Sequence, residues 1–295
     1  MEFFTFKEEM QDVCEEPAVS EEMVINKVSN QIYWWLGERE KKLRSMDHSN
    51  MSINPMLMPI IMELHEMKNS EEYAKFAISS HLMQSYSTGY GKLVDEKILP
   101  NVFGTKKLTT KFRKNMGDIY KQACFDEIDH LIYKKNGEID LLSLKASKWT
   151  IQLTAAVQIN SAFSDIKKLS TSDKIKVNKI YVGVFYGKED SLTDKYDILR
   201  GINRGKNHDV TDIRDFVDIK SGKDFWSWIN KGEKNTQYWV NIGQQIGTER
   251  FKKSRGYGFE KLLEDYEKNF VIHSKNFFDE FGKMSSSKIL KEING

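Results

Sequence analysis

The residues best suited to chemistry are an aspartate and a lysine, Asp129 and Lys145, on either side of a hairpin signal. Alternating residue types predict a β-strand over 125–132, and Asn136-Gly137 predicts a tight turn into a return strand over 139–146. Phosphodiester hydrolysis needs a metal that neutralises charge on the phosphate oxygens and a water activated for attack. A carboxylate beside a lysine offers both functions. Asp129 would bind Mg²⁺, and the Lys145 ammonium would orient the water and face the phosphate.

Spacing alone also supports a simpler interpretation of this pair. An isolated aspartate and lysine that face each other across a hairpin are more often an ordinary surface ion pair than an active site. The pair therefore defines a hypothesis about phosphodiester chemistry, and the surrounding sequence has to decide between the two interpretations.

Composition limits the class of protein. The chain has 295 residues, of which 39% are hydrophobic, which is enough to bury a core. Its 45 basic and 43 acidic residues nearly cancel, so a nucleic-acid partner has to be inferred from local clusters rather than from net charge. Two cysteines, Cys14 and Cys124, form no zinc pattern and suit a reducing cytoplasm. No segment approaches the roughly 20 apolar residues of a membrane span, so we expect no membrane association.

The elements before the hairpin are predicted to be helical. Apolar positions recur at helical spacing over 24–43, and a further helix is expected to begin at or after Pro59. Another helix is expected over 71–83. The glycines in 88–91 predict a break, followed by a last helix that Pro100 ends.

The elements after the hairpin complete a mixed α/β sheet. Residues 150–169 return to helical spacing, and the β-branched and aromatic run 179–186 predicts a central strand covered on both faces. The charged tail, 251–295, is weakly helical and could form an arm or a dimerisation element. We expect three regions: an N-terminal helical region (1–85) that supports dimerisation or DNA binding, a core with a DNA-recognition loop (86–245), and a C-terminal helical tail (246–295).

The hairpin residues resemble those of a known family. Phe125-Asp126-Glu127-Ile128-Asp129-His130, followed by Leu141-Leu142-Ser143-Leu144-Lys145-Ala146-Ser147-Lys148-Trp149-Thr150, resembles the active-site hairpin of PD-(D/E)XK nucleases. More narrowly, it resembles type II restriction endonucleases that cut the partly degenerate sequence RGGNCCY. The resemblance runs from about residue 24 to 245 and includes the stretches 51–55, 89–100, 182–187, 192–196 and 225–228.

The resemblance implies both an activity and partners. It implies a mixed β-sheet core of restriction-endonuclease type flanked by helices, and Mg²⁺-dependent cleavage of double-stranded DNA at RGGNCCY or a related GGNCC-type site. It also implies a homodimer on a near-palindromic duplex, and a cognate DNA methyltransferase that protects the same site in a prokaryotic cell. Asp129 matches the first carboxylate of the family pattern, and Lys145 matches its lysine.

The chain departs from the family pattern at Ser143, where Asp or Glu is expected. A neutral hydroxyl is a weaker metal ligand, so either another acid completes the site, or the Leu144 carbonyl and waters do. Three acids could do so: Asp95 and Glu96, on a helix like one that donates a carboxylate in many nucleases of this superfamily, and Glu127, on the strand face of Asp129. Glu96 is slightly favoured. The expected catalytic residues are thus Asp129, Lys145, Ser143 and Glu96, and the expected metal ligands are Asp129, Leu144, Asp95 and Glu96.

Two segments could contact DNA. A basic cluster just before the hairpin suits phosphate binding, although a solvated loop would have the same composition. The loop 200–208 suits base readout, because arginine and lysine can bind guanine O6 and N7 while asparagine can bind adenine. The expected DNA-binding residues are Lys111, Arg113 and Lys114 in the cluster, and Arg200, Asn203, Arg204, Lys206, Asn207 and His208 in the loop.

Two other functions remain open. The serine at position 143 would suit a DNA-binding protein that kept the nuclease fold and lost the chemistry. The same fold could also serve a nuclease that acts on damaged, branched or single-stranded DNA. Alternation turns His130 away from Asp129, so we expect a structural role for this histidine rather than general-base catalysis.

Overall fold

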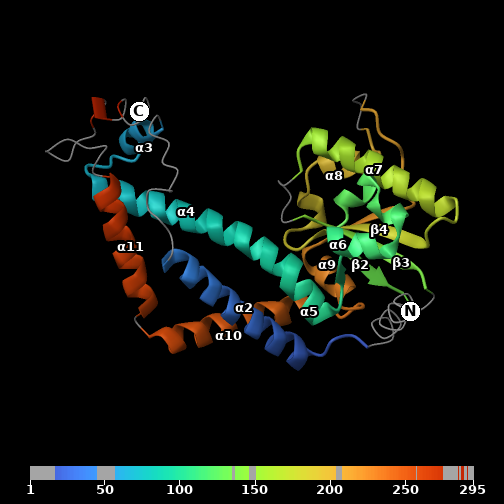
Figure 1. Ribbon diagram of the computed structural model, residues 1–295, viewed down its shortest axis with the longest axis horizontal. Coiled ribbons are helices and arrows are strands. Elements are labelled where there is room, and N and C mark those ends of the chain that lie inside the picture. Colours follow the sequence, from blue (N-terminus) through green and yellow to red (C-terminus); the bar gives the residue numbers. More distant parts are fainter. Residues whose placement is uncertain are drawn as a thin grey trace. The chain divides into compact units, whose positions relative to one another are not determined.

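The computed structural model describes residues 17–44, 57–134, 137–145, 151–203, 208–256 and 258–274, together with residues 285, 287, 288 and 291 (Figure 1). Contacts divide the chain into two compact units. The first contains Gly91–Gln245 and the described part of Met1–Gln31. The second contains Ile32–Tyr90 and the described part of Ile246–Gly295. The first unit thus includes most of the predicted core 86–245.

A five-stranded mixed sheet forms the first unit, with strand order β1-β2-β3-β4-β5 (Figure 1). The first three strands pair antiparallel, and β3, β4 and β5 pair parallel. This arrangement confirms the predicted mixed α/β class with flanking helices. The strands are β1 (Lys106–Lys107), β2 (His130–Tyr133), β3 (Ile139–Lys145), β4 (Val177–Val184) and β5 (Val217–Ser221).

Helices cover both faces of the sheet. On one face α7 (Leu153–Thr171), the crossover between β3 and β4, buries Phe163 in one cluster with Leu141 and Val182. On the other face α9 (Gly222–Ile229) approaches so closely that a Cβ on Gly183 would lie 2.5 Å from the Phe225 ring. The strand predicted over 179–186 is therefore confirmed as a central strand covered on both faces.

The strand predicted over 125–132 is only partly correct. Residues Ala123–Glu127 form a 3₁₀ helix, η4, and β2 begins at His130. Cys124 and Phe125 are consecutive and both buried, which an alternating strand with one buried face does not allow. The Phe125 ring lies 5.0 Å from that of Tyr120, so tertiary packing holds the chain in the turn.

The break predicted at 88–91 and the helix end predicted at Pro100 are both wrong. Helix α4 spans Ser70–Leu93 and runs through the glycines. A Cβ on Gly89 would lie 2.9 Å from Arg39 Cζ, so glycine serves close packing here rather than a turn. A π-helical turn, η2 (Val94–Ile98), follows and leads into α5 (Leu99–Phe103). Pro100 lies in the first turn of α5, where its missing N–H is tolerated.

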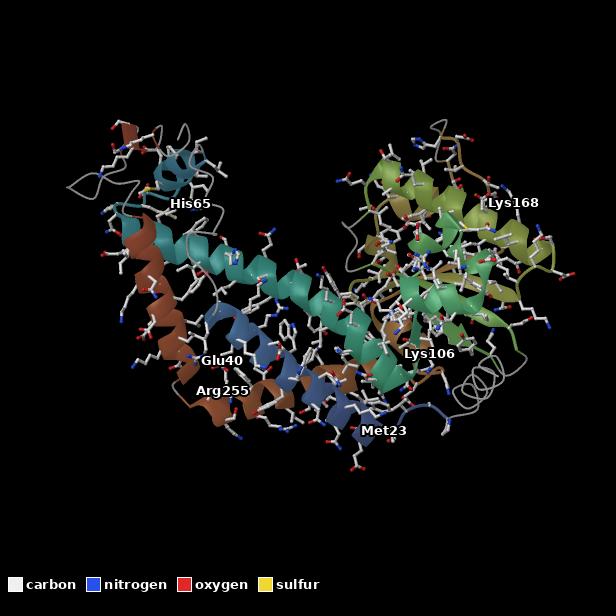
Figure 2. All side chains as sticks on the ribbon, viewed as in Figure 1. Met23, Glu40, His65, Lys106, Lys168 and Arg255 are labelled. Carbon is white, nitrogen blue, oxygen red and sulfur yellow. The ribbon has the colours of Figure 1, made fainter. Side chains whose placement is uncertain are left out.

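The second unit is helical and contains a buried carboxylate that pairs with two more exposed arginines. Glu40 is buried, and its carboxylate accepts hydrogen bonds from Arg44 at 2.8 Å and from Arg255 at 2.6 Å (Figure 2). Burial alone would raise the pKa of Glu40, but the two arginines outweigh it and hold the pKa below its ordinary value. Three helices, α2 (Glu21–Arg44), α4 and α10 (Thr236–Arg255), each have one part in this unit and the other part in the first unit. Helix α2 confirms the helix predicted over 24–43. The helices not yet given bounds are α3 (Met58–Leu64) and α11 (Gly258–Ser274).

Shorter elements fill the first unit. They are α6 (Thr110–Met116), η3 (Asp118–Lys121), η5 (Glu189–Ser191) and α8 (Lys195–Ile198). Among the described residues, every helix falls short of the length and apolarity that crossing a bilayer demands.

Candidate active site

Asp129 is fixed at the start of β2 by the neighbouring strands. Its backbone N–H donates to the Leu142 carbonyl at 2.9 Å, and its own carbonyl accepts from Leu108 N–H at 2.7 Å. Its side-chain Oδ2 accepts from Leu144 N–H at 2.6 Å. One carboxylate oxygen is thus anchored to the backbone of β3, which sets the direction of the whole group.

Lys145 ends β3 close to Asp129. The β2–β3 pairing ends at His130 and Leu142, and beyond it the N–H of Leu144, the residue before Lys145, bonds to the Asp129 carboxylate. Lys145 Nζ lies 3.8 Å from Glu127 Oε2, and Lys145 interacts electrostatically with Asp129. The structure therefore brings Asp129, Lys145 and Glu127 together at one end of the hairpin.

The electrostatics of Asp129 reflect its burial. Burial raises the pKa of Asp129 above its ordinary value, and the Leu144 N–H and Lys145 only partly offset this effect. The Asp95 carboxylate raises it further. Burial is thus the main cause of the raised pKa of Asp129.

Ser143 contributes a hydroxyl with unmet hydrogen-bonding capacity. The residue is fully buried, and its Oγ has no hydrogen-bond partner among the described residues. A buried polar atom of this kind calls for a physical explanation, such as a bound ion or its water. Because Ser143 lies in β3 two residues before Lys145, this hydroxyl is part of the candidate site.

A second polar cluster surrounds His130. Buried His130 has Nε2 2.8 Å from Asp95 Oδ1 and Nδ1 3.0 Å from Thr105 Oγ1. Lys107 on β1 forms an ion pair with the same aspartate. Burial alone would raise the pKa of Asp95, but hydrogen bonds from His130 and Lys107 outweigh it and lower the pKa. Asp95 thus joins η2 to β1 and β2, and buried His130 has a partner at both ring nitrogens.

The three candidate acids are therefore in different surroundings. Asp95 already has two charged or hydrogen-bonding partners on the His130 side of the sheet. Glu96 follows it in η2 and is exposed. Glu127, which the sequence ranked below them, lies beside Lys145.

The predicted recognition loop is partly described. Arg200 donates to Asp197 at 3.0 Å and is turned inward. Asn203 donates through Nδ2 to the His208 carbonyl and accepts from His208 N–H, both at 2.9 Å, so its amide closes the loop on itself. The remaining three predicted loop residues, Arg204, Lys206 and Asn207, lie outside the described residues.

The loop is attached to the core by residues that sequence reasoning missed. Buried Asn160 on α7 donates to the carbonyls of Leu199 at 3.1 Å and Thr211 at 2.9 Å, and it accepts from Thr211 N–H at 2.8 Å. At Gly201, φ is +92°, and a Cβ would lie 2.1 Å from the Thr211 carbonyl oxygen. The sequence signal that could have revealed Asn160 was its amide within the apolar stripe of α7, next to Ile159 and one turn before Phe163.

The basic cluster divides into inward and outward residues. Lys111 and Lys114 are exposed on α6. Arg113 is only 14% exposed and forms an ion pair with Asp126 at 2.5 Å. The two lysines are therefore better placed to meet a phosphate than the arginine between them.

The donor set suits a hard cation. Among the described residues no group of three His, Cys, Asp or Glu side chains could together hold a metal ion. Mg²⁺ does not require such a group, because it usually keeps several waters and binds one or two carboxylates. The Asp129 carboxylate, the adjacent Leu144 carbonyl and the buried Ser143 hydroxyl offer only oxygen, so the residues present fit magnesium.

Comparison with known proteins gives no matching family model and no matching curated relative.

Proposed function

We propose that this protein is a type II restriction endonuclease of the PD-(D/E)XK superfamily, which hydrolyses double-stranded DNA with Mg²⁺ at RGGNCCY or a related GGNCC-type site. The observation that carries the proposal is the arrangement of Asp129 and Lys145. They lie close together at one end of an antiparallel hairpin, and the Leu144 N–H fixes the carboxylate at 2.6 Å. The resemblance of the hairpin, and of the stretch from about 24 to 245, supplies the family.

The residues of the site have distinct roles in this proposal. Asp129 and the Leu144 carbonyl would hold the metal, which when bound supplies neutralising charge to the phosphate oxygens. Lys145 would orient the attacking water and stabilise the negative charge of the transition state. The water oxygen forms a bond to phosphorus while the bridging phosphorus–oxygen bond breaks, and the proton lost by the water is balanced by one gained at the leaving oxygen.

The DNA contacts are assigned to the two basic segments. Exposed Lys111 and Lys114 would bind phosphates and position the duplex, whereas the loop 200–208 would contact base edges. Within the loop, Asn203 would act as a clamp, because its amide is already bonded to His208. A homodimer would place one active site on each strand, and a methyltransferase would protect the same sequence in a prokaryotic cytoplasm.

The test is incubation of a supercoiled plasmid with the purified protein and Mg²⁺. Discrete bands, with fragment ends at one sequence, would support the proposal. Tight binding without cleavage would instead identify a DNA-binding protein, the alternative that Ser143 suggests. A smear or nicking of branched substrates would identify a structure-specific nuclease.

Matched variants connect the activity to the site. Lys145→Ala and Asp129→Ala are each expected to abolish cleavage and to leave DNA binding largely intact. Lys179→Ala and Asp218→Ala are the controls, because this pair also joins neighbouring strands at 3.0 Å but lies on β4 and β5. Appreciable cleavage by either site variant would refute the assignment.

A further inference from the structure

The candidate site lacks an acid where its sequence pattern expects one. Ser143 occupies that position, and its buried Oγ has no partner among the described residues. Mg²⁺ is usually bound through one or two carboxylates, so a second carboxylate close to Asp129 would strengthen a cation site there. Lys145 acts electrostatically on Asp129, so a carboxylate that contacts Lys145 is a candidate for the replacement acid.

Glu127 meets this condition. It is the last residue of η4, and its Oε2 lies 3.8 Å from Lys145 Nζ. Its side chain is 36% exposed, so an ion or a hydrated phosphate could reach it from solvent. The turn that carries it is held in place by the fully buried Phe125. Glu127 is therefore anchored through its backbone and accessible through its carboxylate.

The other two acids are less suitable. The Asp95 carboxylate is already bonded to His130 and paired with Lys107. Glu96 is exposed on η2 and has no contact with Lys145 among the interactions that the described residues make. Of the three acids, only Glu127 contacts Lys145, which also acts electrostatically on Asp129.

We infer that Glu127 supplies the second carboxylate of the cation site, two residues before Asp129 rather than two residues before Lys145. The inference rests on the proposed function, since it completes the same site. Asp129 and Glu127 would hold the cation, with Lys145 beside both carboxylates, and the Ser143 hydroxyl would bond to a water of the hydration shell. Substrate binding would then bring a phosphate oxygen to the same ion.

The experiment measures cation binding directly. Mn²⁺ is titrated into the full chain, and the free ion is followed by electron paramagnetic resonance, with wild type, Glu127→Gln and Asp126→Asn compared. Asp126 is the matched control because it is the adjacent acid, it is exposed, and it pairs with Arg113 rather than with Lys145. We expect Glu127→Gln to weaken Mn²⁺ binding at least about 10-fold, the lower end of what even supporting residues of a metal site contribute. Asp126→Asn should bind as wild type does.

The outcomes separate this inference from the proposed function. If Glu127→Gln binds Mn²⁺ as tightly as wild type while Asp129→Asn does not, the inference is overturned and the nuclease proposal stands. If Glu127→Gln weakens Mn²⁺ binding but the wild type cuts no DNA, the cation site is supported and the nuclease proposal fails. Equal loss in Asp126→Asn and Glu127→Gln would also overturn the inference, because the effect would then come from general negative charge.

Discussion

The loop proposed to contact DNA bases depends on one buried amide, and this dependence can be tested by Asn160→Ala. The substitution removes three hydrogen bonds, to the Leu199 carbonyl and to the carbonyl and N–H of Thr211. Each intramolecular hydrogen bond contributes about 1 kcal/mol net, so the free energy of unfolding should fall by about 3 kcal/mol. Asn160 is 1% exposed, so water has little access to replace the lost bonds.

The matched control is Ser170→Ala on the same helix. Ser170 donates a single hydrogen bond to the Val177 carbonyl at 2.8 Å, so its loss should cost about 1 kcal/mol. Urea unfolding followed by tryptophan fluorescence gives both values, and hydrogen exchange of the Thr211 amide reports the loop itself. If Asn160→Ala destabilises the protein no more than Ser170→Ala, the amide does not anchor the loop.

The effect on recognition distinguishes anchoring from stability. A detached loop would lose base contacts while Asp129 and Lys145 stay in place, so cleavage at the preferred site should fall more than cleavage at related sites. The measurement is the ratio of cleavage rates on duplexes that differ by one base pair. An unchanged ratio in a folded Asn160→Ala protein would refute the role of the loop in base readout.

Three further predictions concern the site and its approach. Burial raises the pKa of Asp129, so ionisation of this carboxyl destabilises the fold as pH rises through the folded-state pKa. Asp129→Asn should therefore be more stable than wild type at neutral pH, and the difference should disappear below the unfolded-state pKa. Thermal unfolding measured across pH would check this. Ser143→Glu restores the expected acid and should tighten Mn²⁺ binding in a Glu127→Gln background; binding no tighter than in Glu127→Gln alone would contradict this. Lys111→Ala should weaken DNA binding evenly across sequences and reduce the slope of log affinity against log salt by about 1, which fluorescence anisotropy at several salt concentrations would check.

The hairpin and the central strand could be predicted because their signals are local. Gly137 adopts φ +79°, a conformation that glycine accepts without strain, and the apolar run that became β4 needs cover on both faces. The same local periodicity failed at 125–127, where the chain turns into η4. There, packing of Phe125 against Tyr120 decided the conformation, and the partner is not visible in the local pattern.

The helix that runs through Gly89 shows the same limit. Glycine usually indicates a turn, but here the absence of a side chain lets Arg39 approach from α2, fifty residues earlier in the chain. The preference for Glu96 over Asp95 stays a prediction, and it was made without knowledge of the residues that surround the two acids. The sequence placed Asp95 and Glu96 on one helix, whereas their different environments depend on His130 and Lys107, which reach η2 only through the sheet.

The network around Asp95 gives a physical reason why another acid would complete the site. His130 is fully buried, and drawing Asp95 toward Asp129 would leave its Nε2 without a partner, at a cost of about 1–3 kcal/mol. The ion pair with Lys107 would be lost in the same movement. Glu127 has no such competing commitment, since its contact with Lys145 at 3.8 Å already belongs to the site. A cation that binds there needs no rearrangement of the sheet, whereas recruiting Asp95 would weaken the connection between η2 and the strand that begins beside Asp129.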